Sequence, residues 1–160
     1  MANTYTQIYI HYVFVVQRRD NLIKGSFREE LQKYITGIIK NHGHLCFTIY
    51  SMPDHTHILV GLNPNQSISD LARDIKANSS KWINEKKFLR SKFNWQVGYG
   101  AFSYAQSQVQ TVVKYINNQP AHHRKTSFRE EYIDFLSKFK VDYKEEYLFE
   151  FLDWIELFQS

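Results

Sequence analysis

The order of two hydrophobic periods along the chain most constrains how it can fold. Strand-like runs, in which apolar and polar residues wholly or partly alternate, cover residues 5–16, 45–50, 55–61 and 99–104. Helical spacing of apolar residues covers residues 27–39, 68–83 and 109–116. The resulting order, β-α-β-β-α-β-α, predicts an α+β fold of the ferredoxin-like (RRM-like) class, an antiparallel sheet with helices on one face plus one additional C-terminal helix and a tail.

The C-terminal part of the chain continues this domain as an extension. A further helix is expected from Ser127, where Glu130 completes a capping box before a run of aromatic residues. The last segment, Tyr147–Phe158, is aromatic and acidic and could be a short helix on the body or a contact with a partner. A length of 160 residues fits one domain. We therefore expect a core domain over residues 1–125 and a helical extension of the same domain over 126–160.

Charge is unevenly distributed between these two parts. Residues 1–125 hold 16 Lys and Arg against 7 Asp and Glu, whereas residues 126–160 hold 4 against 9. A basic body, with a sequence pI of about 9.1, favours a polyanionic partner, although a solvated basic surface would give the same balance.

Cysteine content and hydropathy indicate the compartment. The single cysteine, Cys46, cannot form an internal disulfide, so nothing points to secretion. The first apolar run partly alternates with polar residues and its charges follow it, which is typical of a strand rather than a signal peptide. No apolar run approaches the ~18 residues that a membrane span needs. We expect a cytoplasmic protein without membrane contact.

A pair of histidines opens the third expected strand. His55 and His57 are two residues apart, so a strand would project both imidazoles from one face. Thr56, Ile58 and Val60 would point to the opposite face, which we expect to be the core. Two neighbouring imidazoles can chelate a divalent ion, although surface or structural histidines would give the same pattern.

A tyrosine and a glutamine lie one turn apart near the end of the last core helix. Tyr115 and Gln119 are at positions i and i+4, so they share a face beside a stripe of valines. Gln119 could supply a carbonyl oxygen as a third metal ligand, which would bring Tyr115 near the ion. A half-buried tyrosine and a helix-end glutamine would leave the same pattern.

Three blocks, taken in order, resemble the single-tyrosine HUH transposases, which include the insertion-sequence-200 type and the REP-associated tyrosine transposases. The run Met52–Val60 is similar to the family's metal-binding motif of a histidine, a bulky apolar residue and a histidine. The stretch Trp95–Ser103 resembles the segment before the family's catalytic helix. In that helix the nucleophilic tyrosine precedes a metal-binding glutamine by four residues, as Tyr115 precedes Gln119.

The resemblance covers the chain from the first strand to about Leu148 and implies a transposase. Thr56 departs from the bulky apolar residue of the motif, but it is β-branched and fits a strand. The implied activity is that of a metal-dependent single-strand DNA endonuclease and strand transferase. Tyr115 would attack a phosphodiester to leave a 5′-phosphotyrosine and a free 3′-OH. Such a link conserves the phosphodiester, so a 3′-OH can later rejoin strands without ATP.

The same resemblance implies the cofactor and the partners. His55, His57 and Gln119 would hold Mg²⁺ or Mn²⁺, and the mixed nitrogen and oxygen ligands suit Mn²⁺ well. The expected substrate is single-stranded DNA that contains hairpins, and the expected assembly is a homodimer.

Basic residues near these blocks are the expected DNA contacts. They are Arg18 and Arg19 after the first strand, and Arg73, Lys76 and Lys81 on the basic face of the second helix. The run from His122 to Lys125 could track phosphates or form a solvated turn.

Three other functions fit parts of the pattern. A catalytically inactive, domesticated protein that binds single-stranded nucleic acid would not need all four of His55, His57, Tyr115 and Gln119. A nickase for plasmid replication or conjugation would share the histidine pair, but the flanking blocks resemble transposases instead. A metal-dependent hydrolase of small phosphoesters would bind metal without forming a covalent DNA adduct.

Overall fold

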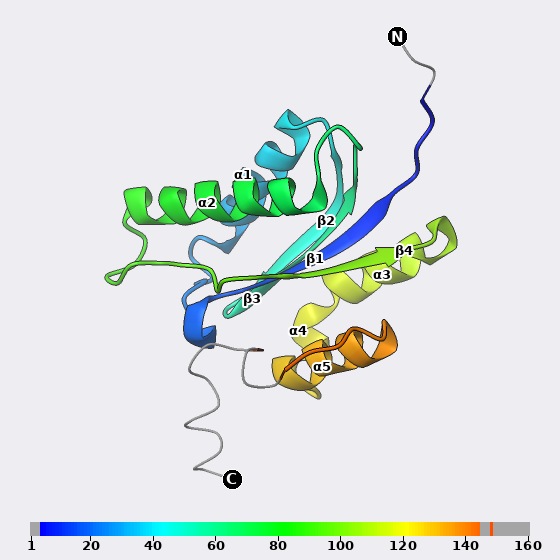
Figure 1. The fold of residues 1–160 in the computed structure, drawn as a ribbon. Coiled ribbons are helices and arrows are strands. Elements are labelled where there is room, and N and C mark those ends of the chain that lie inside the picture. The colour runs from blue at the N-terminus through cyan, green and yellow to red at the C-terminus, as the bar shows by residue number, and fades with distance from the viewer. Residues whose placement is uncertain (1–3, 145–147, 149–160) are drawn as a thin grey trace.

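A four-stranded antiparallel sheet forms the centre of the molecule (Figure 1). The structure is a computed structural model that describes residues 4–144 and 148, so the expected segment Tyr147–Phe158 lies outside the described residues except for Leu148. The sheet has the order β2-β3-β1-β4, and each neighbouring pair is antiparallel. Its strands are β1 (Tyr9–Val15), β2 (Leu45–Met52), β3 (His55–Gly61) and β4 (Gly100–Tyr104).

The helices cover both faces of this sheet. On one face lie α1 (Arg28–Asn41) and α2 (Ile68–Lys86), the two crossover helices of the expected ferredoxin-like pattern, which is confirmed (Figure 1). On the other face lie α3 (Val109–Asn117), the short α4 (Gln119–His122) and α5 (Phe128–Lys138). Two 3-10 turns, η1 (Gln17–Arg19) and η2 (Gln106–Gln108), follow β1 and β4.

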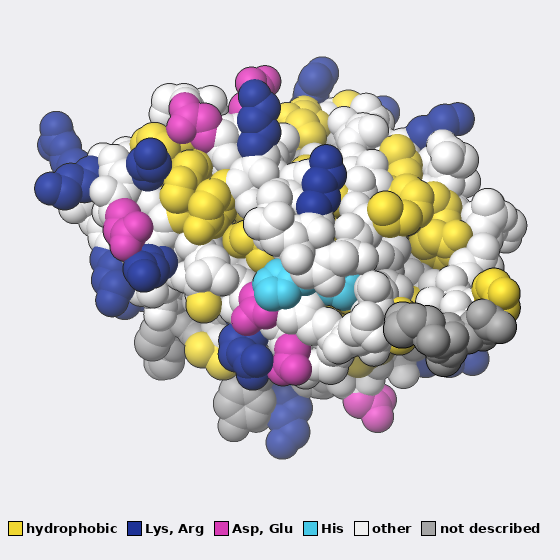
Figure 2. Space-filling model, turned by 90° about the horizontal axis from the view of Figure 1, so that it is seen from above, with side chains coloured by type: hydrophobic (Ala, Val, Ile, Leu, Met, Phe, Trp, Pro, Cys, Tyr) yellow, Lys and Arg dark blue, Asp and Glu magenta, His cyan; other side chains and the backbone are white. Residues whose placement is uncertain are grey.

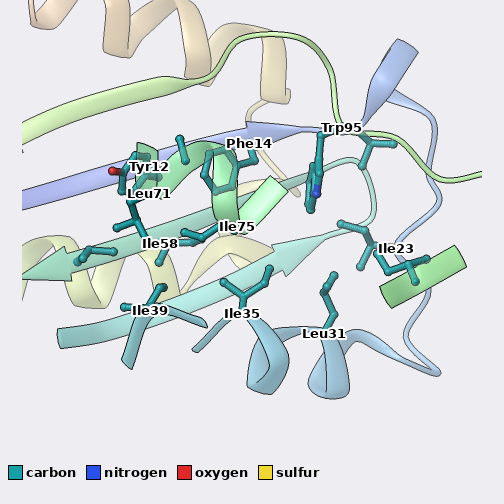
Figure 3. Close-up of a cluster of buried hydrophobic side chains, with 14 of the residues drawn as sticks. Tyr12, Phe14, Ile23, Leu31, Ile35, Ile39, Ile58, Leu71, Ile75 and Trp95 are labelled. Carbon is teal, nitrogen blue, oxygen red and sulfur yellow. The ribbon is translucent and has the colours of Figure 1, made fainter. Parts of the chain in front are cut away.

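The main hydrophobic core fills the space between the sheet and the α1–α2 layer. Helical spacing places Leu31, Ile35 and Ile39 of α1 on the buried stripe that meets the sheet (Figure 3). Alternate residues of the central strands, such as Tyr12 and Ile58, point into the same core. This layer therefore holds the sheet rigidly from one side.

The opposite face of the sheet carries two smaller apolar clusters. One cluster joins Leu59 of β3 to the valine stripe of α3, as Val109 and Val112 show. The other joins Val13 and Val15 of β1 to α5. Polar side chains on this face are thus enclosed between α3, α4 and α5.

Two strands differ from the expected bounds for reasons of pairing. β1 begins at Tyr9 rather than at residue 5, because its ladders with β3 and β4 both begin there. β2 continues to Met52, and a shift of register between Cys46 and Thr48 interrupts its alternation. Phe47, at that irregularity, is 40% exposed.

Gly100 and Gly37 give a matched test of the packing. A Cβ at Gly100 would lie 2.8 Å from Tyr132 Oη and 3.2 Å from Phe102 Cε2, whereas a Cβ at Gly37 in α1 would meet nothing within 4 Å. Overpacking should make Gly100→Ala less stable by about 1–3 kcal/mol. Gly37→Ala should be more stable by about 0.4–1 kcal/mol. Urea denaturation measures both, and a neutral Gly100→Ala would contradict the packing of α5 on β4.

Candidate active site

The histidine pair of β3 lies on the face that α3, α4 and α5 enclose. Val13 and Tyr50 flank His57 in the ladder, and both His55 and His57 are almost fully buried. Ile58 and Val60 point into the main core on the other face. The alternation expected for this strand is confirmed, and the two imidazoles project together.

Asp54, in the turn before β3, fixes the orientation of His55. Its Oδ1 lies 2.7 Å from His55 Nδ1, so the Nδ1–H of the imidazole donates to the carboxylate. Burial is the largest single effect and opposes ionisation of Asp54, but the hydrogen bond from His55 and the electrostatic attraction of His55 and Arg19 together outweigh it, and the pKa of this carboxyl falls below its usual value. His55 Nε2 therefore carries no proton, and its lone pair faces the enclosed space.

Gln119 turns its carbonyl oxygen toward this lone pair. Gln119 is fully buried, and its Oε1 lies 3.3 Å from His55 Nε2. The amide cannot be reversed without a penalty, because its Nε2 donates to Glu131 Oε2 at 3.0 Å. Two acceptor atoms therefore face each other, an arrangement that a cation between them would satisfy.

Tyr115 lies against the histidine pair of its own chain. The Tyr115 and His57 rings are in edge contact, with centroids 6.1 Å apart. α3 ends at Asn117 and a separate turn begins at Gln119, so the two residues are not on one continuous helix, yet both reach Glu131. The Tyr115 hydroxyl donates a hydrogen bond to Glu131 Oε2.

Glu131 of α5 is the centre of the site and was missed by the sequence interpretation. Its side chain is 1% exposed. Oε1 accepts from His57 Nε2 at 2.9 Å, and Oε2 accepts from Tyr115 and Gln119. Burial opposes ionisation, but the interactions with His123, His57 and His55 together outweigh it and hold the pKa of Glu131 far below its usual range. The residue is therefore a buried carboxylate anion.

Two residues of the run from His122 to Lys125 also reach this carboxylate. His122 Nε2 lies 3.2 Å from Oε2, and His123 Nε2 lies 3.3 Å from Oε1. Burial is the largest single effect and lowers the pKa of His123, but the interactions with Glu131, the carbonyl of Thr126 and Asp54 together outweigh it and raise the pKa. His123 Nε2 is nevertheless buried without a well-aligned hydrogen bond. Neither of the two expected roles, phosphate tracking or a solvated turn, accounts for this position.

His11 of β1 supports His57 from behind. It is fully buried, and its Nε2 lies 2.8 Å from His57 Nδ1. Because His57 donates through Nε2 to Glu131, its Nδ1 accepts from His11 in this state. Either imidazole can exchange its donor and acceptor nitrogens, so His11 can also accept when His57 Nε2 becomes a ligand.

These donors form a set that fits a divalent cation. One ligand atom each of His55, His57, His123 and Glu131 lies within 4.8 Å of all the others, and Gln119 Oε1 faces the same space. Imidazole nitrogens together with carboxylate and amide oxygens are a ligand set that can hold a divalent metal ion.

The buried imidazoles predict acid sensitivity in metal-free protein. Burial lowers the pKa of His11 well below the usual histidine value of 6.5, and burial also lowers the pKa of His57. Below pH 6.5 the unfolded chain therefore binds more protons than the folded one, so stability falls as pH falls. We expect a loss of up to about 1.4 kcal/mol per pH unit for each of these two histidines, partly offset by His123, whose pKa is raised. Urea denaturation in EDTA from pH 7 to 5 measures it, and a flat profile would contradict the buried neutral imidazoles.

The predicted DNA contacts fall in two places. Arg18 and Arg19 of η1 lie at the end of the sheet that carries the histidine motif, since Val16 N donates to Asp54 O at 2.9 Å. The α2 residues lie across the sheet from Tyr115, where cationic side chains are spread over the surface (Figure 2). Arg73 pairs with Asp70 and Lys81 with Glu85, whereas Lys76 Nζ donates to the carbonyls of residues 96 and 98.

Comparison with known proteins identifies the family of this chain. A family model described as "Transposase IS200 like" matches residues 4–119. The ISDra2 transposase TnpA of Deinococcus radiodurans is 25% identical over 118 residues, which are 71% of this chain and 84% of the relative.

Two solved structures share the fold. A transposase structure from Deinococcus radiodurans R1 has a TM-score of 0.61 at 18% identity, over 74% of this chain and 95% of that one. A REP-associated tyrosine transposase bound to a REP hairpin has a TM-score of 0.57 at 17% identity, over 77% of this chain and 73% of that one.

Proposed function

This chain belongs to the family of IS200-like transposases, and we propose that it cuts and rejoins single-stranded DNA through Tyr115. One observation carries the proposal. The Tyr115 hydroxyl, the two motif histidines and a buried carboxylate converge on one space inside a single chain. A structural tyrosine has no need of a neighbouring cluster of metal-ligating side chains.

The proposed reaction conserves the phosphodiester bond. The Tyr115 oxygen attacks phosphorus, the bond to the 3′ oxygen breaks, and the products are a 5′-phosphotyrosine and a 3′-OH. Burial and the negative charge of Glu131 raise the pKa of Tyr115, so the hydroxyl stays protonated in this state. A bound divalent cation would neutralise Glu131 and polarise the scissile phosphate.

We propose that His55, His57 and Gln119 hold the ion together with Glu131 and His123. Asp54 and His11 would orient the two motif imidazoles through their second nitrogens. Of the two ions that the family resemblance implies, Mn²⁺ accepts imidazole nitrogens more readily than Mg²⁺.

The proposed substrate and assembly are those that the family resemblance implies. We propose that the protein acts on single-stranded DNA at hairpins, as a homodimer, in the cytoplasm at the nucleoid. The structure of a relative bound to a REP hairpin supports the choice of substrate. No helix in the described part of the chain is both long and apolar enough to cross a membrane.

We propose two sets of DNA contacts at different distances from the reaction. Arg18 and Arg19 would contact the strand near the histidine motif, because η1 lies beside the turn that carries Asp54. Arg73, Lys76 and Lys81 on α2 would contact DNA that wraps toward the other face.

Residues 126–160 are proposed to be part of the catalytic domain. The support is α5, which packs on β1 and β4 and supplies Glu131 to the site. A domain of residues 1–125 would therefore lack the central carboxylate.

A gel assay tests the proposed function against an inactive nucleic-acid binder. Purified protein would be incubated with end-labelled hairpin oligonucleotides, with Mn²⁺ or with EDTA, and run on a denaturing gel. We expect an adduct with Mn²⁺ on single strands and none with EDTA or duplex. Binding without an adduct would favour the inactive binder, and a failure to bind single strands would contradict both.

A further inference from the structure

Two hollows meet at Tyr115. The first, of about 360 Å³, lies between α3 and α5, and the second, of about 610 Å³, lies between α3 and the turn after α4. Thr111, Tyr115 and His122 line both, so the tyrosine stands at their boundary. A phosphate that reaches this hydroxyl must have one flanking nucleotide on each side of it.

The second hollow has the chemistry of a phosphate-binding surface. Its lining includes Lys114, Arg124 and Lys125, all exposed, and no carboxylate among the described residues. Closely spaced cations beside a nucleophile that attacks a phosphodiester match a DNA backbone. Three residues of the run from His122 to Lys125 therefore line a phosphate-binding surface, namely His122, Arg124 and Lys125.

The first hollow has the chemistry of a nucleobase site. Tyr104, Val112 and Phe135 contribute apolar and aromatic wall, and Phe135 makes an edge contact with Tyr115, with ring centroids 5.8 Å apart. Asp134 and Lys138 line it from α5 and are exposed. Its volume is at the small end of the roughly 300–1,000 Å³ typical of ligand sites, a size that suits one nucleotide rather than a folded strand.

We propose that the base of one nucleotide next to the scissile phosphate inserts into the first hollow, while the backbone on the other side of that phosphate crosses the second. This inference rests on the proposed function and adds to it the protein residues that contact the two nucleotides at the cleavage site. The base stacks on the aromatic wall, and the Asp134 carboxylate accepts from an exocyclic amino group. Cytosine, adenine or guanine is therefore favoured over thymine at this position.

Abasic scanning with a pocket-filling variant tests the first hollow. Single abasic sites would be placed on each side of the cleavage position of an oligonucleotide that wild-type protein cuts. Ser107 lies in η2, and Ser107→Trp fills the hollow from its exposed rim. Gln110→Trp is the control, since Gln110 is exposed at the start of α3 and lies outside both hollows. Adduct yield would be measured for every pair of protein and oligonucleotide.

One abasic position should lower the adduct yield of wild type and of Gln110→Trp by about 10-fold, the usual effect of one lost stacking contact. Ser107→Trp should start about 10-fold lower and lose nothing further at that position. Equal sensitivity at every position, or a Ser107→Trp variant that behaves as wild type, would overturn the base site while the wild-type adduct still upholds the proposed function. No adduct on any intact oligonucleotide would overturn both.

Salt dependence of binding tests the second hollow without catalysis. In EDTA, Lys125→Ala should reduce the magnitude of the negative slope of log K, the DNA-binding constant, against log salt concentration by about 1. This is the change expected when one phosphate contact is lost. Lys33→Ala on α1, exposed and across the sheet, is the control and should leave the slope unchanged. An unchanged slope for Lys125→Ala would overturn the backbone path.

Discussion

Tyr115→Phe is expected to abolish the covalent adduct while single-strand binding persists. Removal of a covalent nucleophile lowers rates by on the order of 10⁶-fold, so the remaining activity would be below the detection limit of a gel assay. The variant also removes one hydrogen bond to Glu131, but His57 and Gln119 still donate to that carboxylate. Stability should therefore fall by only about 1 kcal/mol. Denaturing gels measure the adduct, and fluorescence anisotropy measures the binding.

Tyr104→Phe is the matched control for this change. Tyr104 is half-buried and lines the same hollow, and burial raises its pKa to about 12. It does not contact Glu131 by any described hydrogen bond, so its hydroxyl has no part in the proposed attack. If the adduct survived in Tyr115→Phe and vanished in Tyr104→Phe, the nucleophile would be Tyr104, which would contradict the assignment of Tyr115.

Glu131→Ala should cause the second largest effect, on both folding and metal binding. The carboxylate accepts from His57, Tyr115 and Gln119, and its removal leaves these buried donors without their partner. Loss of one member of a buried charged network typically destabilises by about 3–5 kcal/mol. Urea denaturation in EDTA measures this loss. Calorimetric titration should also show Mn²⁺ affinity reduced by at least 10-fold.

Glu130→Ala separates this effect from a general change in α5. Glu130 is the adjacent residue, is exposed, and contributes only its backbone N–H to the Ser127 cap. It should keep wild-type stability within about 0.5 kcal/mol and wild-type Mn²⁺ affinity. If the two variants behaved alike, Glu131 would have no special role.

The fold could be predicted from the sequence because each strand and helix buries one face. The alternation of β3 and the helical stripe of α1 follow directly from that constraint. The start of β1 at Tyr9 and the irregularity at Phe47 could not be predicted in the same way. They depend on where partner strands begin and end, which local periodicity does not encode.

Half of the candidate site could be predicted, and the other half depends on the docking of α5. The histidine motif identified His55 and His57, and the resemblance to a tyrosine that precedes a glutamine by four residues identified Tyr115 and Gln119. Glu131 left a signal, because a carboxylate three residues after Phe128 lies on the buried stripe of α5. That signal shows burial but no partner, since the sequence does not say which face of the sheet α5 covers.

His11 left a similar signal, a titratable side chain on the face of β1 that also carries Val13 and Val15. Its partner His57 is 46 positions away in sequence. Only the register of β1 and β3 brings the two imidazoles within hydrogen-bond distance. A buried polar residue can thus be recognised locally, whereas its role requires the strand pairing.

Mapping the adduct by mass spectrometry tests the assignment of the nucleophile most directly. The Mn²⁺-dependent adduct would be trimmed with nuclease and then cut with trypsin, which releases the peptide Tyr115–Arg124 between Lys114 and Lys125. This peptide contains one tyrosine, so a nucleotide mass on it places the 5′ phosphate on Tyr115. We expect that mass shift on this peptide alone. A shift on a peptide that carries Tyr104 or Tyr132 instead, or DNA cut without any modified peptide, would contradict a Tyr115 nucleophile.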